Sequence, residues 1–72
     1  MPKREWLIEA RKSKDLSRLA LADEVGINET YVEKIENGKR TPRFPVAIRI
    51  GKALDIPQDD ILLRFYADRT SA

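Results

Sequence analysis

The run LSRLALADEVGINETYVEKIENGKRTPR, residues 16–43, decides which fold this chain of 72 residues can adopt. It holds two stretches with apolar residues at helical spacing, separated by Gly26. A glycine that directly follows a helix favours the left-handed backbone that ends it. Ser17 and Asn28 stand where a side-chain oxygen can cap the first free amides of each stretch. We therefore predict two short helices, over about residues 17–25 and 28–36, joined by a tight turn as in a helix-turn-helix.

The apolar residues of this run indicate which side of each helix is buried. The first helix has an apolar face made of Leu19, Ala20, Leu21, Ala22 and Val25. From both helices and the turn we expect core positions at Leu21, Ala22, Val25, Ile27, Val32 and Ile35, with Tyr31 partly inward. The outward side of the second helix is then polar and consists of Asn28, Glu29, Thr30, Glu33 and Lys34.

The order of residues resembles the lambda repressor/Cro-like (Xre-type) helix-turn-helix family. The matching residues are Leu16-Ser17, Leu21-Ala22, Val25-Gly26-Ile27, Val32, Ile35-Glu36-Asn37-Gly38 and Pro42, extending to Ile50 and Ala53-Leu54. They cover roughly residues 3–63, and Ile-Glu-Asn-Gly followed by basic residues and proline is their most specific part. The resemblance implies an all-α fold, a compact five-helix lambda-repressor-like domain. It also implies an ion pair of Arg11 with Glu36 that ties the first helix to the end of the third.

Three further helices complete the predicted domain. The first covers about residues 3–13, begins near Pro2 and turns Leu7 and Ala10 inward. Another covers about residues 45–54 and buries Val46, Ala47, Ile50 and Leu54, and the last begins after Ile56-Pro57. Trp6 either covers the edge of the core or contacts a partner chain, and its position leaves both open. We assign residues 1–67 to the helix-turn-helix domain and residues 68–72 to a flexible C-terminal tail.

The composition argues against catalysis and against a membrane segment. The chain has no histidine, which removes the commonest general base and the commonest metal ligand. It has no cysteine either, so a nucleophile and its base would have to be serine or threonine with lysine. Lys and Arg number 14 against 12 Asp and Glu, so the net charge of +2 says little about partners. No apolar run approaches the length of a membrane span. We expect a non-enzymatic cytoplasmic, nucleoid-associated protein without cofactor, metal or small-molecule ligand.

The resemblance implies double-stranded DNA as the partner, with the second helix of the motif in the major groove. Base contacts are then expected from Asn28, Glu29, Thr30, Glu33 and Lys34. Phosphate contacts are expected from Ser17, Arg18, Asn37, Lys39, Arg40 and Thr41. Arg43 resembles an arginine of phage repressors that can enter a narrow minor groove near the operator centre. Together these residues predict a sequence-specific transcriptional regulator, a repressor of phage, plasmid, restriction-control or antitoxin type.

Two acidic residues on the DNA-facing side depart from the family pattern. Glu29 and Glu33 are one helical turn apart, where many relatives have serine, arginine or glutamine. A carboxylate can accept from cytosine N4, but it also raises the electrostatic cost of approaching phosphates. The same two residues are compatible with solvated side chains, or with pairing to Lys34 or Arg40. The alternative function is therefore a protein-interaction module on the same fold.

One copy of a domain this small makes few DNA contacts, so a homodimer on two half-sites is expected. The candidates for the seam between the copies are apolar residues of the last helix and of the nearby loops. These candidates are Phe44, Ile56, Ile61, Phe65 and Tyr66. The pattern does not choose between the helix and the loops.

Overall fold

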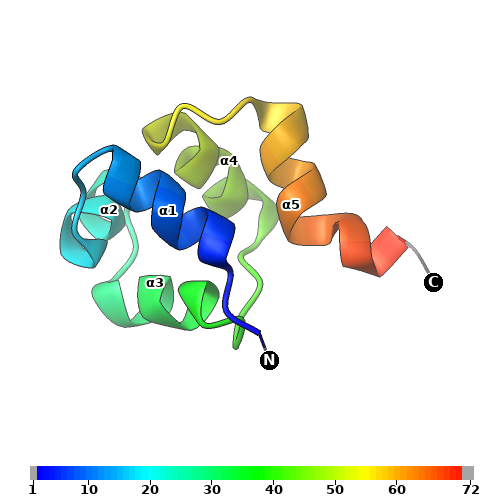
Figure 1. Ribbon diagram of the computed structural model, residues 1–72, viewed down its shortest axis with the longest axis horizontal. Helices are drawn as coiled ribbons and strands as arrows, with labels where there is room; N and C mark the ends of the chain where they lie inside the picture. The colour runs from blue at the N-terminus through cyan, green and yellow to red at the C-terminus, as the bar shows by residue number, and fades with distance from the viewer. Residues whose placement is uncertain (1, 71–72) are drawn as a thin grey trace.

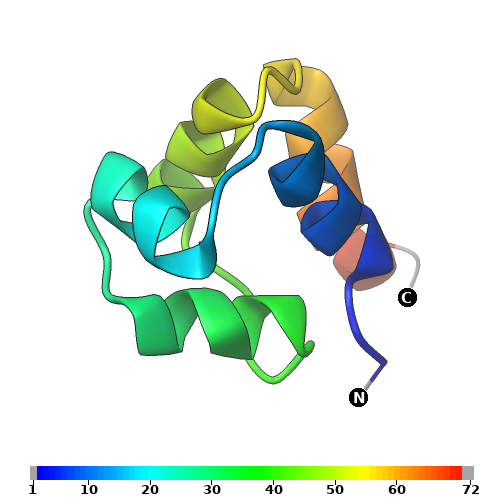
Figure 2. The ribbon, with the colours of Figure 1, turned by 60° about the vertical axis from the view of Figure 1, so that its left-hand side comes forward.

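The computed structural model describes residues 2–70 and places five helices in them, with no strand among these residues. In chain order they are α1 (Glu5–Ser13), α2 (Arg18–Val25), α3 (Glu29–Glu36), α4 (Phe44–Ala53) and α5 (Gln58–Thr70). In both views α3 forms one edge of the molecule, while α4 and α5 pack together on the other side of the core (Figures 1 and 2). The predicted all-α, five-helix fold is confirmed.

The two helices of the motif begin and end on the residues that the sequence indicates. The hydroxyl oxygen of Ser17 accepts from the amide of Ala20 at 3.0 Å, and the side-chain carbonyl of Asn28 accepts from the amide of Tyr31 at 2.8 Å. Gly26 ends α2 with φ 84°, a left-handed conformation that costs glycine little. Asp15 and Asp55 adopt φ 57° after α1 and α4, which the sequence did not predict. Lys14 forms an ion pair with Asp55 and so joins these two turns.

One core lies between the helices. Its buried apolar residues are Leu7, Leu21, Ala22, Val25, Val32, Ile35, Ala47, Ile50, Leu54, Ile61 and Phe65. Ala10, Ile27 and Val46 are only half-buried and pack against its edge, although the sequence predicted them inside. Leu19 is 54% exposed, because α2 turns Leu21, Ala22 and Val25 inward and leaves Leu19 on its outer side. Trp6 covers the core edge, its ring 5.1 Å from that of Phe65.

The first and last helices begin or end differently from the prediction. α1 begins at Glu5 rather than residue 3, because Arg4 leaves helical geometry with ψ 80° and donates its amide to Glu36 O at 2.7 Å. The segment before α1 therefore runs beside the end of α3 (Figure 2). α5 continues to Thr70 and so covers the first three residues of the predicted tail, 68–70, and residues 71–72 lie outside the described part of the chain.

Gly51 allows α4 and α5 to approach closely. A Cβ at Gly51 would lie 3.1 Å from the carbonyl oxygen of Ile56 and 3.2 Å from a methyl carbon of Ile61. Both distances are shorter than ordinary van der Waals contact, so the contact depends on the missing side chain. Within residues 2–70, no helix has the length and apolar character needed to cross a membrane.

Candidate nucleic-acid interface

α3 presents a polar side to solvent along the edge of the molecule. Val32 and Ile35 anchor the helix in the core, with 2% and 0% exposure. The five residues predicted to face bases are all exposed, namely Asn28, Glu29, Thr30, Glu33 and Lys34. Asn28 uses its carbonyl oxygen for the cap, which leaves its amide hydrogens as donors. The geometry therefore offers donors and acceptors on one unobstructed helix face.

An open hollow joins this helix face to the loop that follows. It is lined by Asn28, Thr30, Tyr31, Lys34 and Arg40. The exposed side chain of Arg40 thus borders the same depression as the predicted base-facing residues, although it is six positions beyond Lys34. A surface that offers a cation beside hydrogen-bonding groups suits a phosphate next to a base edge.

The loop between α3 and α4 carries two of the cations predicted to meet phosphates, Lys39 and Arg40, and the residue predicted for the minor groove, Arg43. All three are exposed, whereas Asn37 and Thr41 are half-buried. Pro42 is fully buried, and its carbonyl oxygen accepts from the hydroxyl of Tyr66 at 2.6 Å. The loop is therefore attached to α5 while its charged side chains remain in solvent.

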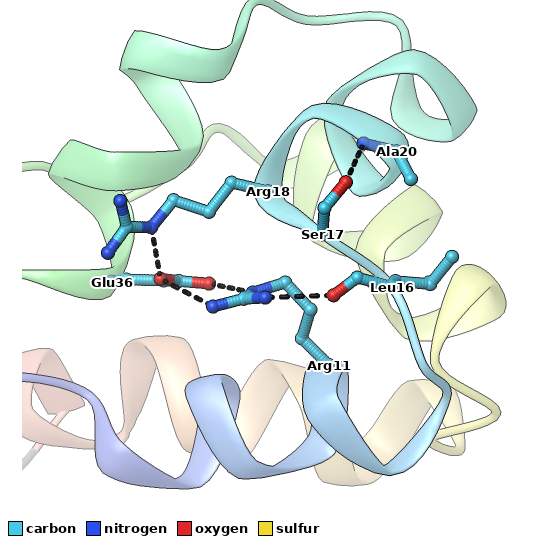
Figure 3. Close-up of polar contacts among 6 residues, drawn as sticks. All are labelled: Arg11, Leu16, Ser17, Arg18, Ala20 and Glu36. Atoms are coloured by element: carbon cyan, nitrogen blue, oxygen red, sulfur yellow. Dashed lines mark hydrogen bonds and ion pairs between the residues drawn. The ribbon is translucent and has the colours of Figure 1, made fainter.

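Two arginines converge on one buried carboxylate behind this surface (Figure 3). Arg11 Nε donates to Glu36 Oε2 at 2.6 Å, and another Arg11 nitrogen donates to the carbonyl oxygen of Leu16 at 2.8 Å. Arg18 Nε donates to the second carboxylate oxygen at 3.1 Å. Glu36 is 1% exposed and Arg11 7%, so this pair ties α1 to the end of α3 inside the domain.

The prediction for Arg18 omitted this internal contact. Its side chain is 43% exposed, and within residues 2–70 its two terminal nitrogens form no hydrogen bond. Ser17, predicted beside it for a phosphate contact, serves as the cap of α2 with its hydroxyl oxygen and is exposed. Both side chains keep donor groups at the start of α2.

Within the part of the chain that the structure describes, Glu29 and Glu33 have no charged partner. The ion pairs of the described residues involve Glu36, Asp55 and Asp60 as acids, and neither Lys34 nor Arg40 pairs with a carboxylate. The two carboxylates are exposed on the same side as Lys34. They lower the positive charge of this surface but leave it sterically open.

The predicted seam residues divide into accessible and inaccessible ones. Ile61 is 0% exposed and Phe65 4%, because α5 turns them onto Gly51 and Trp6, so neither can reach a second chain and their assignment to the seam was wrong. Phe44 is 55% exposed, while Ile56 and Tyr66 are half-buried. Leu63, which is not among the predicted seam residues, is 63% exposed. An apolar depression is lined by Phe44, Leu62, Leu63, Tyr66 and Ala67.

Among the described residues, no group of three or more acidic, histidine or cysteine side chains is placed to hold a metal ion. The candidate surface consists of a polar helix face and a basic loop beside it.

Comparison with known proteins points in the same direction. A family model described as helix-turn-helix matches residues 7–61. The chain is 32% identical over 65 residues to the cryptic phage CTXphi transcriptional repressor RstR of Vibrio cholerae. This alignment covers 90% of the present chain and 58% of that repressor. The chain thus spans little more than half the length of this relative.

Proposed function

Because the chain belongs to the lambda repressor/Cro-like helix-turn-helix family, we propose that it is a transcriptional regulator that binds double-stranded DNA sequence-specifically. The observation that carries the proposal is the polar side of α3, exposed along its length and bordered by the cations of the next loop. The similarity to a phage transcriptional repressor supports repression as the mode of action and phage-type control as the setting. The protein would act on the nucleoid in the cytoplasm and needs no cofactor for this.

In this proposal α3 lies in the major groove with its N-terminal residues at the base edges. Lys34 donates to guanine O6 and N7, and Glu29 or Glu33 accepts from cytosine N4. Thr30 contributes its methyl or hydroxyl group, and Asn28 its amide hydrogens. The acidic residues then select against neighbouring bases that present only acceptors, which turns their electrostatic cost into specificity.

Phosphate contacts on both sides of the groove hold α3 in place. One strand of the duplex is contacted at its phosphates by the residues that begin α2, Ser17 and Arg18. The phosphates of the other strand are contacted by residues at the end of α3 and in the next loop, namely Asn37, Lys39, Arg40 and Thr41. Arg18 is suited to this because Glu36 orients its Nε and leaves two donors outward. Arg43 enters the minor groove near the centre of the site.

Two copies bind two half-sites about one turn of DNA apart. The seam that we propose is the apolar depression of Phe44, Leu62, Leu63, Tyr66 and Ala67, and its occupant is a second copy of the chain. Phe44 directly follows Arg43, so the patch adjoins the residue assigned to the centre of the operator. Two copies that meet at that centre bring these patches together across a two-fold axis.

Selection of bound duplexes from a random pool, followed by titration of the selected duplex at several salt concentrations, tests the proposal. We expect a palindromic site and an affinity that falls steeply with salt, because each phosphate contact releases counterions. Failure to retain any duplex at low salt would refute DNA binding and favour a protein-interaction module.

A further inference from the structure

The segment before α1 reaches back to the end of α3 through Arg4. Its backbone amide donates to Glu36 O at 2.7 Å. Its Nη1 donates to the carbonyl oxygens of Ile35 at 2.6 Å and of Arg40 at 2.9 Å. Its Nη2 donates to the hydroxyl oxygen of Thr41 at 3.0 Å, and the guanidinium lies 5.3 Å above the ring centre of Phe65. One residue thus joins the end of α3, the following loop and α5.

These acceptors require the shape of a guanidinium. The carbonyl at the end of a helix carries partial negative charge and has no partner within the helix, so a cation there is favourable. The planar fork of arginine directs several N–H groups in fixed directions and stacks on an aromatic face, whereas lysine offers a compact point charge. A lysine at this position keeps the charge but lacks the planar fork and the stacking on Phe65, so we expect it to hold the Ile35, Arg40 and Thr41 oxygens less well.

The loop that Arg4 holds is the one to which the proposed function assigns phosphate contacts. Arg40 and Thr41 are held directly, and Lys39 lies between them and the end of α3. The amides of Lys39 and Arg40 both donate to the carbonyl oxygen of Lys34, at 2.9 and 3.2 Å. Arg4 and the base-facing residue Lys34 therefore support the same short segment from two sides.

We propose that Arg4 is a positioning residue for DNA binding, which fixes the α3–α4 loop in its phosphate-binding shape before DNA arrives. Its guanidinium donates to acceptors inside the domain, so Arg4 contributes to DNA affinity by holding the loop and not by a phosphate contact of its own. This inference rests on the proposed function. It adds that the segment before α1 contributes to the binding surface without touching DNA.

The test compares Arg4→Lys with Arg64→Lys, since both changes keep the net charge. Arg64 is the matched control because it also lies over an aromatic ring, 5.3 Å from the centre of Trp6, and has its ion pair on α5 with Asp60. The probe is the duplex recovered by selection, titrated at a temperature where circular dichroism shows each protein folded. We expect Arg4→Lys to bind roughly tenfold more weakly, as for the loss of hydrogen bonds from a charged donor, and Arg64→Lys to bind like the wild type.

A second measurement reports on the loop in the free protein. Hydrogen exchange of the Lys39 and Arg40 amides should accelerate by about tenfold in Arg4→Lys while the amides of α2 keep their protection. The salt dependence of binding should keep its slope, because no phosphate contact is removed. Arg4→Gln, which keeps a neutral amide NH2 group but loses the charge, should bind as weakly as the lysine variant or more weakly.

The possible results test the proposed DNA binding and the positioning role of Arg4 separately. Wild-type protein that binds no duplex refutes the proposed function and the role of Arg4 with it. Wild-type protein that binds, together with an Arg4→Lys variant of equal affinity, refutes the role of Arg4 alone. Faster exchange without loss of affinity would likewise show that Arg4 serves only the fold, and a slope reduced by about one unit would assign it a direct phosphate contact instead.

Discussion

Glu36 forms ion pairs with two arginines, and the two pairs differ in their exposure to solvent. The side chain of Arg11 is 9% exposed and that of Arg18 is 43% exposed. Removing one partner of a buried pair leaves a charge without compensation, which costs about 3–5 kcal/mol, whereas an exposed pair contributes about 0–1 kcal/mol. We therefore expect Glu36→Gln to lower the free energy of unfolding by about 3–5 kcal/mol.

Urea unfolding followed by circular dichroism measures this difference. Arg18→Gln is the control, since it removes only the exposed contact and should change the free energy of unfolding by at most about 1 kcal/mol. Equal losses for the two variants would mean that the carboxylate is less important to the fold than its burial indicates. A domain of this size has only about 4–11 kcal/mol in total, so the first variant is expected close to its unfolding threshold.

Lys34 and Lys39 are both exposed, but in the proposed docking Lys34 contacts a base edge and Lys39 contacts a phosphate. Lys34→Ala should change which base pair is preferred at one position, by about 1–3 kcal/mol of discrimination. Lys39→Ala should weaken binding to all sequences alike and reduce the salt slope by about one unit. Selection of duplexes with each variant distinguishes them. A change of sequence preference in the Lys39 variant, with none in the Lys34 variant, would contradict the docking.

The contact between α4 and α5 depends on Gly51. A β-carbon at this position would already lie 3.1 Å from the carbonyl oxygen of Ile56 and 3.2 Å from a methyl carbon of Ile61. The two methyl groups of a valine would crowd the same neighbours further. Overpacking of this kind costs about 1–3 kcal/mol, so Gly51→Val should lower the unfolding midpoint in urea. Lys52→Val controls for the β-branched side chain in the same helix, because Lys52 is exposed. A Gly51 variant as stable as this control would show that the two helices separate easily.

The helices of the motif were predictable because their determinants are local. Ser17, Gly26 and Asn28 act on backbone groups within four residues, so the sequence alone located α2 and α3 to within one residue. The face of α5 was not predictable in this way. The segment from Ile61 to Tyr66 has apolar residues on several sides of a helix, and only packing on Gly51 and Trp6 selects Ile61 and Phe65 for the core.

The start of α1 and the role of Arg18 were missed for a related reason. The guanidinium of Arg4 donates hydrogen bonds to residues 31 to 37 positions away, and Arg18 donates to a carboxylate 18 positions away. Helical periodicity carries no information about such distant partners. A lone arginine before a helix looks like any solvated charge until the fold places carbonyl oxygens around it.

At the scale of the whole molecule, the surface proposed to face DNA and the apolar patch meet at one loop. Arg4 holds its first half through Arg40 and Thr41, and Tyr66 holds its second half through Pro42. Phe44 then begins α4 and contributes to the patch. A second copy seated on the patch would therefore lie beside residues assigned to the DNA backbone, so dimer formation and operator binding should be linked.

Leu63→Gln tests this link. Leu63 is 63% exposed, so the change should alter the free energy of unfolding by no more than about 0.5 kcal/mol. Burial of a leucine stabilises by about 1.5 kcal/mol or more, and a two-fold seam buries it twice. The dissociation constant of the dimer should therefore rise by roughly a hundredfold, as about 3 kcal/mol requires.

Sedimentation equilibrium measures this constant, and titration of the selected duplex measures operator affinity. Leu19→Gln is the matched control, since Leu19 is 54% exposed on α2 and lies outside the patch. If the Leu63 variant dimerises and binds the full site like this control, the seam lies elsewhere. If it binds one half-site normally and loses only affinity for the full site, the two copies meet through α5 as proposed.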